Sequence, residues 1–335
     1  MRTWCSLLVI VLVLTISIRA EADSEGSCKL LPISVDGRRG YIDATGKVVV
    51  EPKFDYAYKF SNGLGIIGMG DKHAYVDCKG EIAIPFSTRS SGDFSEGLAT
   101  VEIDEKFGFM DKTGKIVIEP RFDHAYDFSE GLASVKTGDK YGYIDKAGNV
   151  VIKPRFEWAQ DFSEGLARVI LNGREYYINQ TGKIAIRFSK SVTAIALFFS
   201  EGLASVRVGS RWGFINKSGR FVIPPKFDEP FAFSEGLCAV SLGRYSGYID
   251  RKGKVAIPAR YERTYFFSEG LGIVKIKGKQ GFIDKSGRLV IPAVYDNAWP
   301  FSDGIAMVHV DGKNGYINRK GEYIWVPTYL WPPTK

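Results

Sequence analysis

Residues 128–161 read FSEGLASVKTGDKYGYIDKAGNVVIKPRFEWAQD, and this stretch decides the fold because it recurs along the chain. Each copy is marked by a tetrapeptide of the Gly-aromatic-Ile-Asp type, which starts at residues 40, 74, 108, 142, 176, 213, 247, 281 and 315. The copies at 74 and 176 are degenerate, since they begin with alanine and tyrosine. Seven of the eight intervals are 34 residues long and one is 37. Such a period is typical of stacked repeat architectures.

Each copy predicts a three-stranded antiparallel meander followed by a connecting segment. In the quoted copy, residues 132–136, 140–145 and 149–153 are expected strands, and Pro154 ends the third. Asp145 and Gly148 frame the second turn, where the aspartate caps a type I turn and the glycine accepts the positive φ of a G1 bulge. A calcium loop is disfavoured, because lysine or arginine occupies most copies of this turn and further carboxylates are missing.

The aromatic residues repeat at fixed positions and therefore predict the core. One column contains Tyr143 and its equivalents, and the other contains the phenylalanines of the Phe-Ser-Glu-Gly motif: Phe60, Phe94, Phe128, Phe162, Phe199, Phe233, Phe267 and Phe301. The alternative, that these aromatic columns form an exposed ladder on which a ligand stacks, is disfavoured. The glutamates of the motif, such as Glu130, are interpreted as turn residues bonded to amides or to a neighbouring cation, because catalysis needs one asymmetric site.

The predicted fold is all-β, a tandem array of about nine 34-residue meanders over residues 33–329. We expect an open β-solenoid or superhelix, with a closed, β-propeller-like ring as the alternative. The open form is favoured because propellers typically have about four to eight blades of about 40–45 residues. The segments 31–36 and 323–331 are expected to cap the two ends. The 37-residue interval predicts a bulge or kink near residues 186–198.

The ends of the chain carry signals other than the repeat. Residues 1–22 are predicted to be a secretory signal peptide, because the 13-residue apolar run 6–18 is shorter than the roughly 20 residues that span a bilayer. Residues 23–32 form an N-terminal segment and residues 330–335 a tail. Cleavage after Ala22 removes two arginines and one glutamate, so the formal net charge changes from +7 to +6. Because the net positive charge is small and the basic residues are spread along the whole chain, we expect no nucleic-acid partner.

Three cysteines remain after cleavage. Cys238 replaces an alanine of sister repeats and is expected to be a small buried hydrophobic residue. Cys78 lies in a predicted turn, and a bridge between Cys28 and Cys78 is one possibility. An odd number of cysteines excludes complete internal pairing.

The combined motifs resemble a known family. A Lys-aromatic-Gly-aromatic-Ile-Asp-Lys-x-Gly-Lys motif is followed by Val-Ile-x-Pro-x-Phe-Asp and Phe-Ser-Glu-Gly-Leu-Ala, and this succession resembles the WG-containing repeat family. The best copy is Arg211–Asn216, in which Trp212 and Gly213 keep the family's Trp-Gly pair. Other copies replace the tryptophan, for example by Phe107 or Tyr141. The resemblance covers residues 33–329 and implies an exported interaction module without catalytic residues.

The connecting segments vary most between copies, so we expect a binding surface there. Five aromatic residues of these segments are candidates for stacking on a protein or polysaccharide: Tyr58, Tyr126, Trp158, Tyr265 and Trp299. The alternative is that they pack against the next repeat. An enzyme is disfavoured because the three histidines, His73, His124 and His309, stand apart from any nucleophile or metal motif.

The sequence therefore predicts an exported, non-catalytic repeat scaffold, either secreted or in the periplasm or cell envelope. No cofactor, no metal and no membrane span after cleavage are expected. A purely structural protein of the cell envelope is the alternative function.

Overall fold

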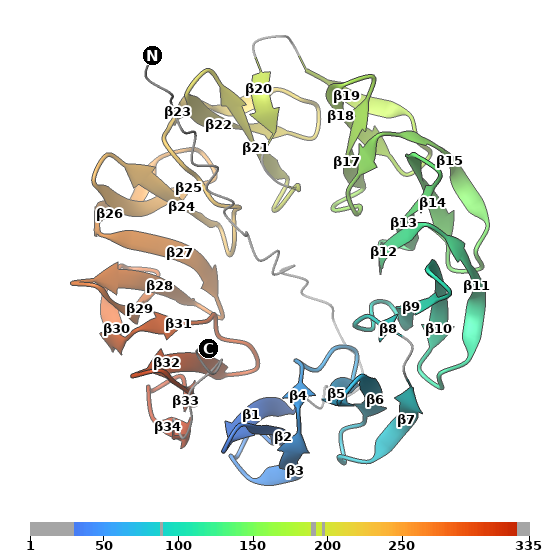
Figure 1. Ribbon diagram of the computed structural model, residues 1–335. Coiled ribbons are helices and arrows are strands. Elements are labelled where there is room, and N and C mark those ends of the chain that lie inside the picture. The colour runs from blue at the N-terminus through green and yellow to red at the C-terminus, as the bar shows by residue number, and fades with distance from the viewer. Residues whose placement is uncertain (1–29, 88–89, 189–191, 196–197, 327–335) are drawn as a thin grey trace, which may run out of the picture.

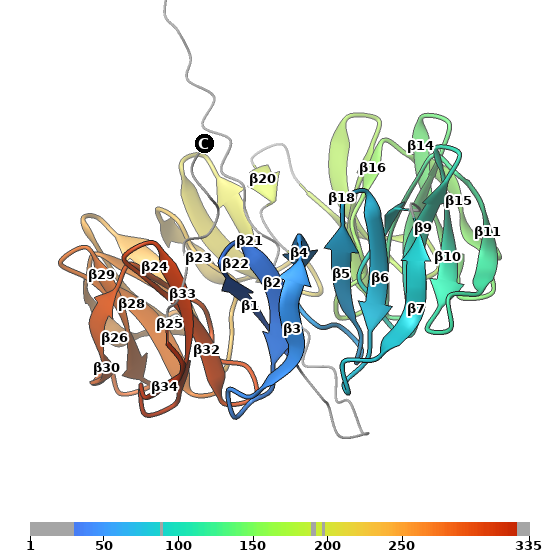
Figure 2. The same cartoon turned by 60° about the horizontal axis from the view of Figure 1, so that its bottom comes forward.

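The computed structural model describes residues 30–326 except 88–89, 189–191 and 196–197. Within these residues the chain forms nine small antiparallel sheets that follow one another around a closed ring (Figure 1). Each sheet is one blade of a β-propeller. In the tilted view of Figure 2 the strands of a blade run between the two faces of the ring.

The first five blades follow the chain in order. The first blade contains β1 (Leu31–Val35), β2 (Arg38–Ile42) and β3 (Val48–Phe54). The second and third contain β4 (Tyr56–Ala57), β5 (Gly65–Met69), β6 (Lys72–Val76), β7 (Ile82–Ser87), β8 (Ser90–Ser91), β9 (Leu98–Ile103), β10 (Lys106–Asp111) and β11 (Ile116–Phe122). The fourth and fifth contain β12 (His124–Ser129), β13 (Leu132–Thr137), β14 (Lys140–Asp145), β15 (Val150–Phe156), β16 (Trp158–Ala159), β17 (Leu166–Leu171), β18 (Arg174–Asn179) and β19 (Ile184–Arg187).

The remaining four blades complete the ring. The sixth and seventh contain β20 (Val192–Ile195), β21 (Leu203–Val208), β22 (Arg211–Asn216), β23 (Phe221–Phe227), β24 (Leu237–Leu242), β25 (Tyr245–Asp250) and β26 (Val255–Tyr261). The eighth and ninth contain β27 (Arg263–Ser268), β28 (Leu271–Ile276), β29 (Lys279–Asp284), β30 (Leu289–Tyr295), β31 (Asn297–Ala298), β32 (Ile305–Val310), β33 (Lys313–Asn318) and β34 (Tyr323–Trp325).

The expected open solenoid is wrong, because the ninth blade packs against the first. Tyr316 in β33 donates a hydrogen bond from its hydroxyl to the carbonyl of Pro32 at 2.8 Å. Ile33 and Ile42 of the first blade share a buried cluster with Ile305 of the ninth. The segments expected as caps instead contribute β1 and β34 to two neighbouring blades. Closure removes the exposed sheet edges that an open array would have to protect.

The sequence favoured the open form because the unit is shorter, and the repeat count higher, than in typical propellers. In the structure the connecting segment contains a further short strand: Trp158 and Ala159 of β16 pair with Ile170 and Val169 of β17. The repeat is therefore a four-stranded blade, with its short first strand innermost and its fourth strand outermost (Figure 1). The usual upper limit of about eight blades does not hold for this short, 34-residue unit.

The predicted Asp-x-x-Gly turn is confirmed. In the fourth blade Asp145 accepts hydrogen bonds at Oδ1 from the amides of Ala147 at 3.0 Å and Asn149 at 2.8 Å. The amide of Gly148 donates to the carbonyl of Asp145, and Gly148 has a φ of 82°. The capped turn with its positive-φ glycine joins the two outer strands of the blade.

The Phe-Ser-Glu-Gly motif forms the hairpin between the first two strands of a blade. Ser129 pairs with Leu132 in the antiparallel ladder, and Glu130 and Gly131 between them have φ values of 53° and 82°. Two consecutive positive φ values define a type I′ turn, which matches the right-handed twist of strands. Glutamate rarely adopts this conformation, so contacts outside the hairpin are needed to favour it.

Those contacts come from the next blade. The carboxylate of Glu130 accepts a hydrogen bond at 2.8 Å from the amide of Gly165, in the following Phe-Ser-Glu-Gly hairpin. Glu235 does the same with Gly270 and also pairs with Lys285 at 3.1 Å. We call this contact the glutamate clamp; it recurs at Glu96, Glu164, Glu201 and Glu269. The predicted turn role of these glutamates is confirmed.

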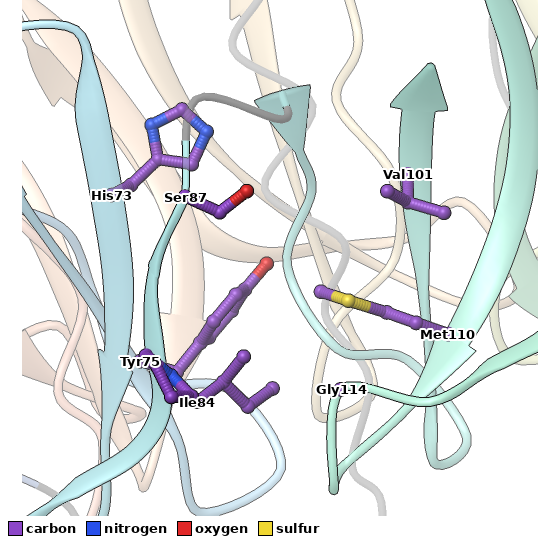
Figure 3. A pocket seen from close by; sticks show the side chains of 8 residues that line it. His73, Tyr75, Ile84, Ser87, Val101, Met110 and Gly114 are labelled. Carbon is purple, nitrogen blue, oxygen red and sulfur yellow. The ribbon is translucent and has the colours of Figure 1, made fainter.

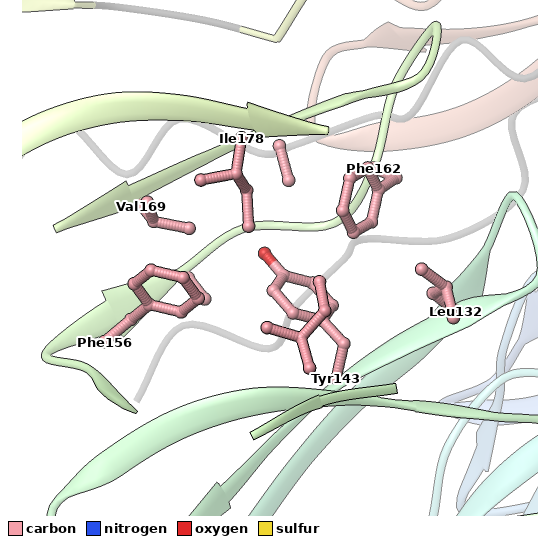
Figure 4. Packing of buried hydrophobic residues seen from close by; sticks show 9 residues of the cluster. Leu132, Tyr143, Phe156, Phe162, Val169 and Ile178 are labelled. Atoms are coloured by element: carbon pink, nitrogen blue, oxygen red, sulfur yellow. The ribbon is translucent and has the colours of Figure 1, made fainter. Parts of the chain in front are cut away.

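A core lies between every two neighbouring blades rather than inside one blade. Between the fourth and fifth blades, Tyr143 and Phe156 pack against Phe162, Val169 and Ile178 (Figure 4). The rings of Tyr143 and Phe162 have centroids 4.9 Å apart. Tyr143 is fully buried and Phe162 nearly so, which confirms the two aromatic columns as core. Burying such side chains contributes roughly 1.5–3 kcal/mol each.

Serine hydroxyls connect the same hairpins. Ser129 donates to the carbonyl of Phe162 at 2.6 Å, 33 residues ahead. Ser163 donates to the carbonyl of Phe199 at 2.8 Å, across the longer interval. The contact between the fifth and sixth blades is therefore kept despite the three extra residues. The bulge predicted near 186–198 partly concerns residues 189–191 and 196–197, outside the described residues; in β20 the pairing shifts between Val192 and Ala194.

The cysteines differ in their states. Cys238 is free and buried, as expected, and burial raises the pKa of its thiol. Cys78 is disulfide-bonded. Cys28 and the predicted signal peptide lie outside the described residues, as does the predicted C-terminal tail.

The first prediction concerns Gly142, the first residue of the tetrapeptide in the fourth blade. A Cβ on Gly142 would lie 2.4 Å from the carbonyl oxygen of Ile152 and 2.7 Å from the nitrogen of Pro154. Both neighbours are backbone atoms of β15, so Gly142→Ala should destabilise the protein by about 3 kcal/mol in urea unfolding. Gly138→Ala is the control: nothing lies near its Cβ, and only its φ of 61° is unfavourable, at about 1 kcal/mol. Equal losses for the two variants would contradict the packing argument.

The blade contacts also predict acid sensitivity. Burial acts to raise the pKa of Glu96, but hydrogen bonds from Lys146 and from the amide of Gly131 lower it overall. Side-chain hydrogen bonds from Asn149 and Ser286, aided by backbone amides, lower the pKa of Asp145 and Asp284. Carboxylates with lowered folded-state pKa values stabilise the protein above their unfolded values of about 4 and lose this contribution as the pH falls.

We therefore expect the Tm, followed by circular dichroism, to be steady near neutrality and to fall steeply below about pH 4. Glu96→Gln should flatten this fall, whereas Glu119→Gln, on the exposed surface of β11, should not. A Tm that stays constant down to pH 3 would contradict the stabilising role of these carboxylates.

Candidate functional site

The variable positions of the repeats meet at the inner strands. The aromatic residues of the connecting segment lie in the first strand of a blade or directly after it, and this strand lies on the inner side of the ring (Figure 1). Next to it lies the residue that precedes the glycine of the tetrapeptide, at the start of the third strand. These two sets of positions form a surface at which neighbouring blades differ.

Rings are in contact over this surface at the boundary between the third and fourth blades. Phe107 of β10 lies 5.2 Å from the ring of His124, which lies 4.7 Å from Tyr126. Tyr126 in turn lies 6.2 Å from Tyr141 of β14. We call these four residues, together with Tyr56, Tyr58 and His73 of the second blade, the aromatic rim. Burial foremost, and then the neighbouring Tyr141, raises the pKa of Tyr126, so its hydroxyl stays neutral.

The second blade presents a similar group. The rings of Tyr56 and Tyr58 are 5.5 Å apart, and the hydroxyl of Tyr56 lies 3.1 Å from Nδ1 of His73. Tyr58 is 53% exposed and Tyr126 is 36% exposed, so both present a ring to solvent. An exposed ring with a polar tip suits a ligand that offers both apolar and hydrogen-bonding groups.

The other three predicted residues have different surroundings. Trp158 is half-buried beneath Arg168, whose guanidinium lies 5.3 Å from the indole and pairs with Glu175 at 2.5 Å. Tyr265 packs on the core between the eighth and ninth blades and accepts a hydrogen bond from Gln280 at 3.3 Å. Trp299 lines a hollow between the ninth and first blades. The five residues are therefore spread around the ring and do not form one compact site.

Sequence reasoning missed the contribution of the position before the tetrapeptide glycine. Phe107 and Tyr141 occupy this position, and they complete the aromatic rim beside His124 and Tyr126. The signal was present in the sequence as the same kind of variability that marks the connecting segments. The second strand brings the two variable positions to the same level of the blade, because His124 and Tyr141 both pair with Lys136 of β13.

The described residues contain no cluster of three or more histidine, cysteine or acidic side chains placed to hold a metal ion. His73, His124 and His309 belong to the second, fourth and ninth blades. Over the same residues the structure has no helix with the length and apolarity to cross a bilayer.

A small hollow of about 50 Å³ lies between the second and third blades. Figure 3 shows Ser87, Tyr75 and Ile84 on one side of it and Val101 and Met110 on the other. Ser87 pairs with His73, whereas the equivalent partners in the next blades are Phe122 and Phe156. The hollow therefore arises because a serine replaces a large core residue, and its volume suits little more than a water molecule.

The repeat model of one family matches the chain eight times, over residues 40–72, 75–107, 107–141, 141–174, 177–212, 212–244, 247–279 and 281–313. That family is described as the WG containing repeat. The chain belongs to the WG-containing repeat family. The resemblance inferred from the motifs is therefore confirmed. The matched repeats are offset from the blades: the match over 107–141, for example, begins in β10 of the third blade and ends in β14 of the fourth.

Several solved structures are also similar to this chain. A crystal structure described as a eukaryotic initiation factor is 13% identical, with 89% of this chain and 95% of that chain covered and a TM-score of 0.64. The structure of apo AztD from Citrobacter koseri is 11% identical, covers 88% of this chain and 92% of that chain, and has a TM-score of 0.44. At such identities the likeness to the initiation factor shows a shared fold alone. Among curated proteins, no sequence matches the WG-repeat chain.

Proposed function

We propose that the ring is an exported, non-catalytic scaffold that binds an extended protein or glycan segment through the aromatic rim. The observation that carries the proposal is the continuous set of ring contacts from Phe107 through His124 and Tyr126 to Tyr141. These contacts cross the boundary between two blades, and they occupy positions at which the repeats differ. A surface that varies over a constant core is what a binding scaffold requires.

One cation beside the rim can receive an acidic group of a ligand. Lys136 lies 6.0 Å from the centre of the Tyr141 ring. Outside the rim, Arg207 takes the equivalent position two blades on, 5.6 Å from the Trp212 ring. Cations beside aromatic faces can pair with carboxylates while the rings stack on sugar or peptide groups. The disulfide at Cys78 supports export, because disulfides persist in oxidising compartments.

A purely structural role in the cell envelope is the competing function. It is favoured by the repeated positions, since the clamps, turns and aromatic columns all stabilise the ring itself. Family membership and the shared fold fit this role directly, because they specify a scaffold and no ligand.

The two functions predict different effects of rim substitutions. Mature chain carrying Tyr58→Ala or Tyr126→Ala should lose about tenfold or more in affinity for a ligand of the envelope, because exposed tyrosines in a binding surface act as hot spots. Binding is measured with envelope extracts and, separately, with a panel of acidic and neutral polysaccharides. Tyr323→Ala is the control, because that tyrosine is 45% exposed on the outermost strand of the ninth blade.

The Tm of each variant is measured beside its binding. The proposal expects binding to fall while the Tm stays within a few degrees of the wild type. Unchanged binding with a lowered Tm would contradict the binding role and favour the structural one.

A further inference from the structure

The outer wall of the ring is not uniform in charge. It is formed by the outermost strands of the blades, such as β26 and β30 in Figure 1, and by the Asp-x-x-Gly turns that precede them. In the sixth to eighth blades these segments contain nine lysine or arginine residues and two acidic ones, over residues 216–227, 250–261 and 284–295. In the first three blades they contain six basic and six acidic residues, over 43–54, 77–87 and 111–122. Basic residues therefore occur all around the wall, but acidic residues balance them only on one side.

On the basic side of the wall, cations stand next to exposed apolar residues. Directly before each outermost strand lies an exposed cation, and the first residue of the strand is apolar and exposed; this gives the pairs Arg220 with Phe221, Lys254 with Val255, and Arg288 with Leu289. We call these six residues the outer patch. Its three apolar residues are 44%, 48% and 45% exposed. Large apolar residues that stay exposed side by side mark a surface for interaction.

The three pairs are neighbours because each turn packs on the preceding blade. Lys226 of β23 donates a hydrogen bond at 3.3 Å to the carbonyl of Gly253, in the turn before β26. Arg260 of β26 donates in the same way at 2.6 Å to the carbonyl of Gly287, in the turn before β30. The cations and apolar side chains of three blades thus form one continuous surface.

The cations of the outer patch are available to a partner. Arg220 and Lys254 form no ion pair with any residue that the structure describes. Arg288 pairs with Asp284 at 3.0 Å, but its side chain is 80% exposed. Asp250 is held inside its own turn, where its carboxylate accepts two amide hydrogen bonds. The patch therefore presents a net positive charge beside apolar surface.

We propose that the outer patch docks the ring on an anionic lipid surface. Phe221, Val255 and Leu289 enter the headgroup region, and the cations beside them meet the lipid phosphates. Basic residues combined with exposed apolar side chains are what lets a protein lie on a bilayer without spanning it. An acidic polysaccharide would pair with the cations but would gain little from aliphatic side chains.

The strand edges at the patch argue against a peptide that extends the sheets. β23, β26 and β30 are the last strands of their sheets, and each contains proline: Pro224 and Pro225, Pro258, and Pro292. Proline has no N–H to offer to an added strand and is typical of protected sheet edges. The wall of a closed ring is also convex (Figure 1), which suits a flat partner better than an inserted segment.

The inference goes beyond the proposed function, because the aromatic rim lies on other blades and nearer the inner side of the ring. A ring attached through its outer wall would keep the rim free for a ligand. The two proposals are tested separately, since vesicles contain neither protein nor glycan.

The first test is flotation of the mature chain, residues 23–335, with vesicles of phosphatidylcholine alone or mixed with anionic phosphatidylglycerol. Residues 1–22 are left out because their apolar run could itself enter the vesicles. We expect binding to the anionic vesicles only. This binding should weaken as NaCl is raised from about 0.1 M to about 1 M, because the Debye length falls from about 10 Å to about 3 Å. No binding to the anionic vesicles, or equal binding to both kinds, would overturn the proposal.

The second test removes the charge of the patch. The triple variant Arg220→Gln, Lys254→Gln and Arg288→Gln should bind anionic vesicles about a hundredfold more weakly, since each basic residue near such a surface contributes about fivefold. The matched control removes the same charge from exposed turn residues of the first three blades, by Lys47→Gln, Lys79→Gln and Lys115→Gln, and should keep most of the affinity. Equal losses in the two triple variants would show a response to net charge alone and overturn the patch.

The third test separates lipid from a soluble acidic polymer. Phe221→Ser with Leu289→Ser should weaken vesicle binding about tenfold, because less apolar surface enters the headgroup region. Ile82→Ser with Val117→Ser, at positions 50% and 42% exposed on the first three blades, should not. Each variant replaces exposed residues, so its Tm should stay within a few degrees of the wild type. Vesicle binding that the patch serines leave unchanged, or equally tight binding of the wild type to polyglutamate, would show an acidic-polymer site and overturn the lipid assignment.

Discussion

The structure depends on the way each Phe-Ser-Glu-Gly hairpin holds the next one. A single blade has too little interior for a core, so the tyrosine or phenylalanine of its third strand is buried only when the following hairpin covers it, as Phe162 covers Tyr143. The glutamate in a left-handed conformation and the serine hydroxyl make their hydrogen bonds to that same neighbour. Backbone strain, hydrogen bonding and apolar burial thus all favour the addition of a further blade.

A chain of such contacts has two unsatisfied ends unless it returns to its start. Ring closure satisfies both, because Tyr316 meets the first blade through the carbonyl of Pro32 as Tyr248 meets the eighth through the carbonyl of Ile273. The closing contact therefore resembles an ordinary contact between blades. The repeat pattern is not uniform around the ring within the described residues: the seventh blade, β24–β26, has three strands, and Ser87 stands where other blades have a phenylalanine.

Much of this structure could be predicted from the sequence, because the local chemistry is repeated. Asp145 with Gly148 specified its turn, and the alternating residues specified three strands per repeat. Ring closure could not be predicted in this way, since it depends on the angle between blades, which results from packing around small inner residues such as Ala159. The type I′ turn was missed because a glutamate rarely has positive φ, and only the contact to the next blade explains it.

The candidate site was predicted in part for the same reason. Variable aromatic residues such as Tyr126 could be found by comparing the repeats, but their neighbours depend on which strands pair. Trp158, beneath Arg168, and Tyr265, on a core cluster, show that an aromatic residue at a variable position can also serve packing. Repeated positions build the ring, and the positions that differ determine what its inner surface presents.

Ring closure is tested most directly by a distance measurement between the first and ninth blades. Spin labels at Lys47 and Glu322, exposed residues at equivalent turns, should give one narrow, short distance by double electron–electron resonance. The control pair Lys47 and Glu81 reports the same geometry between the first and second blades, and the closed ring predicts that both pairs give similar distances. A long or broad distance for Lys47 and Glu322, with a short one for the control pair, would show an open array and contradict the account.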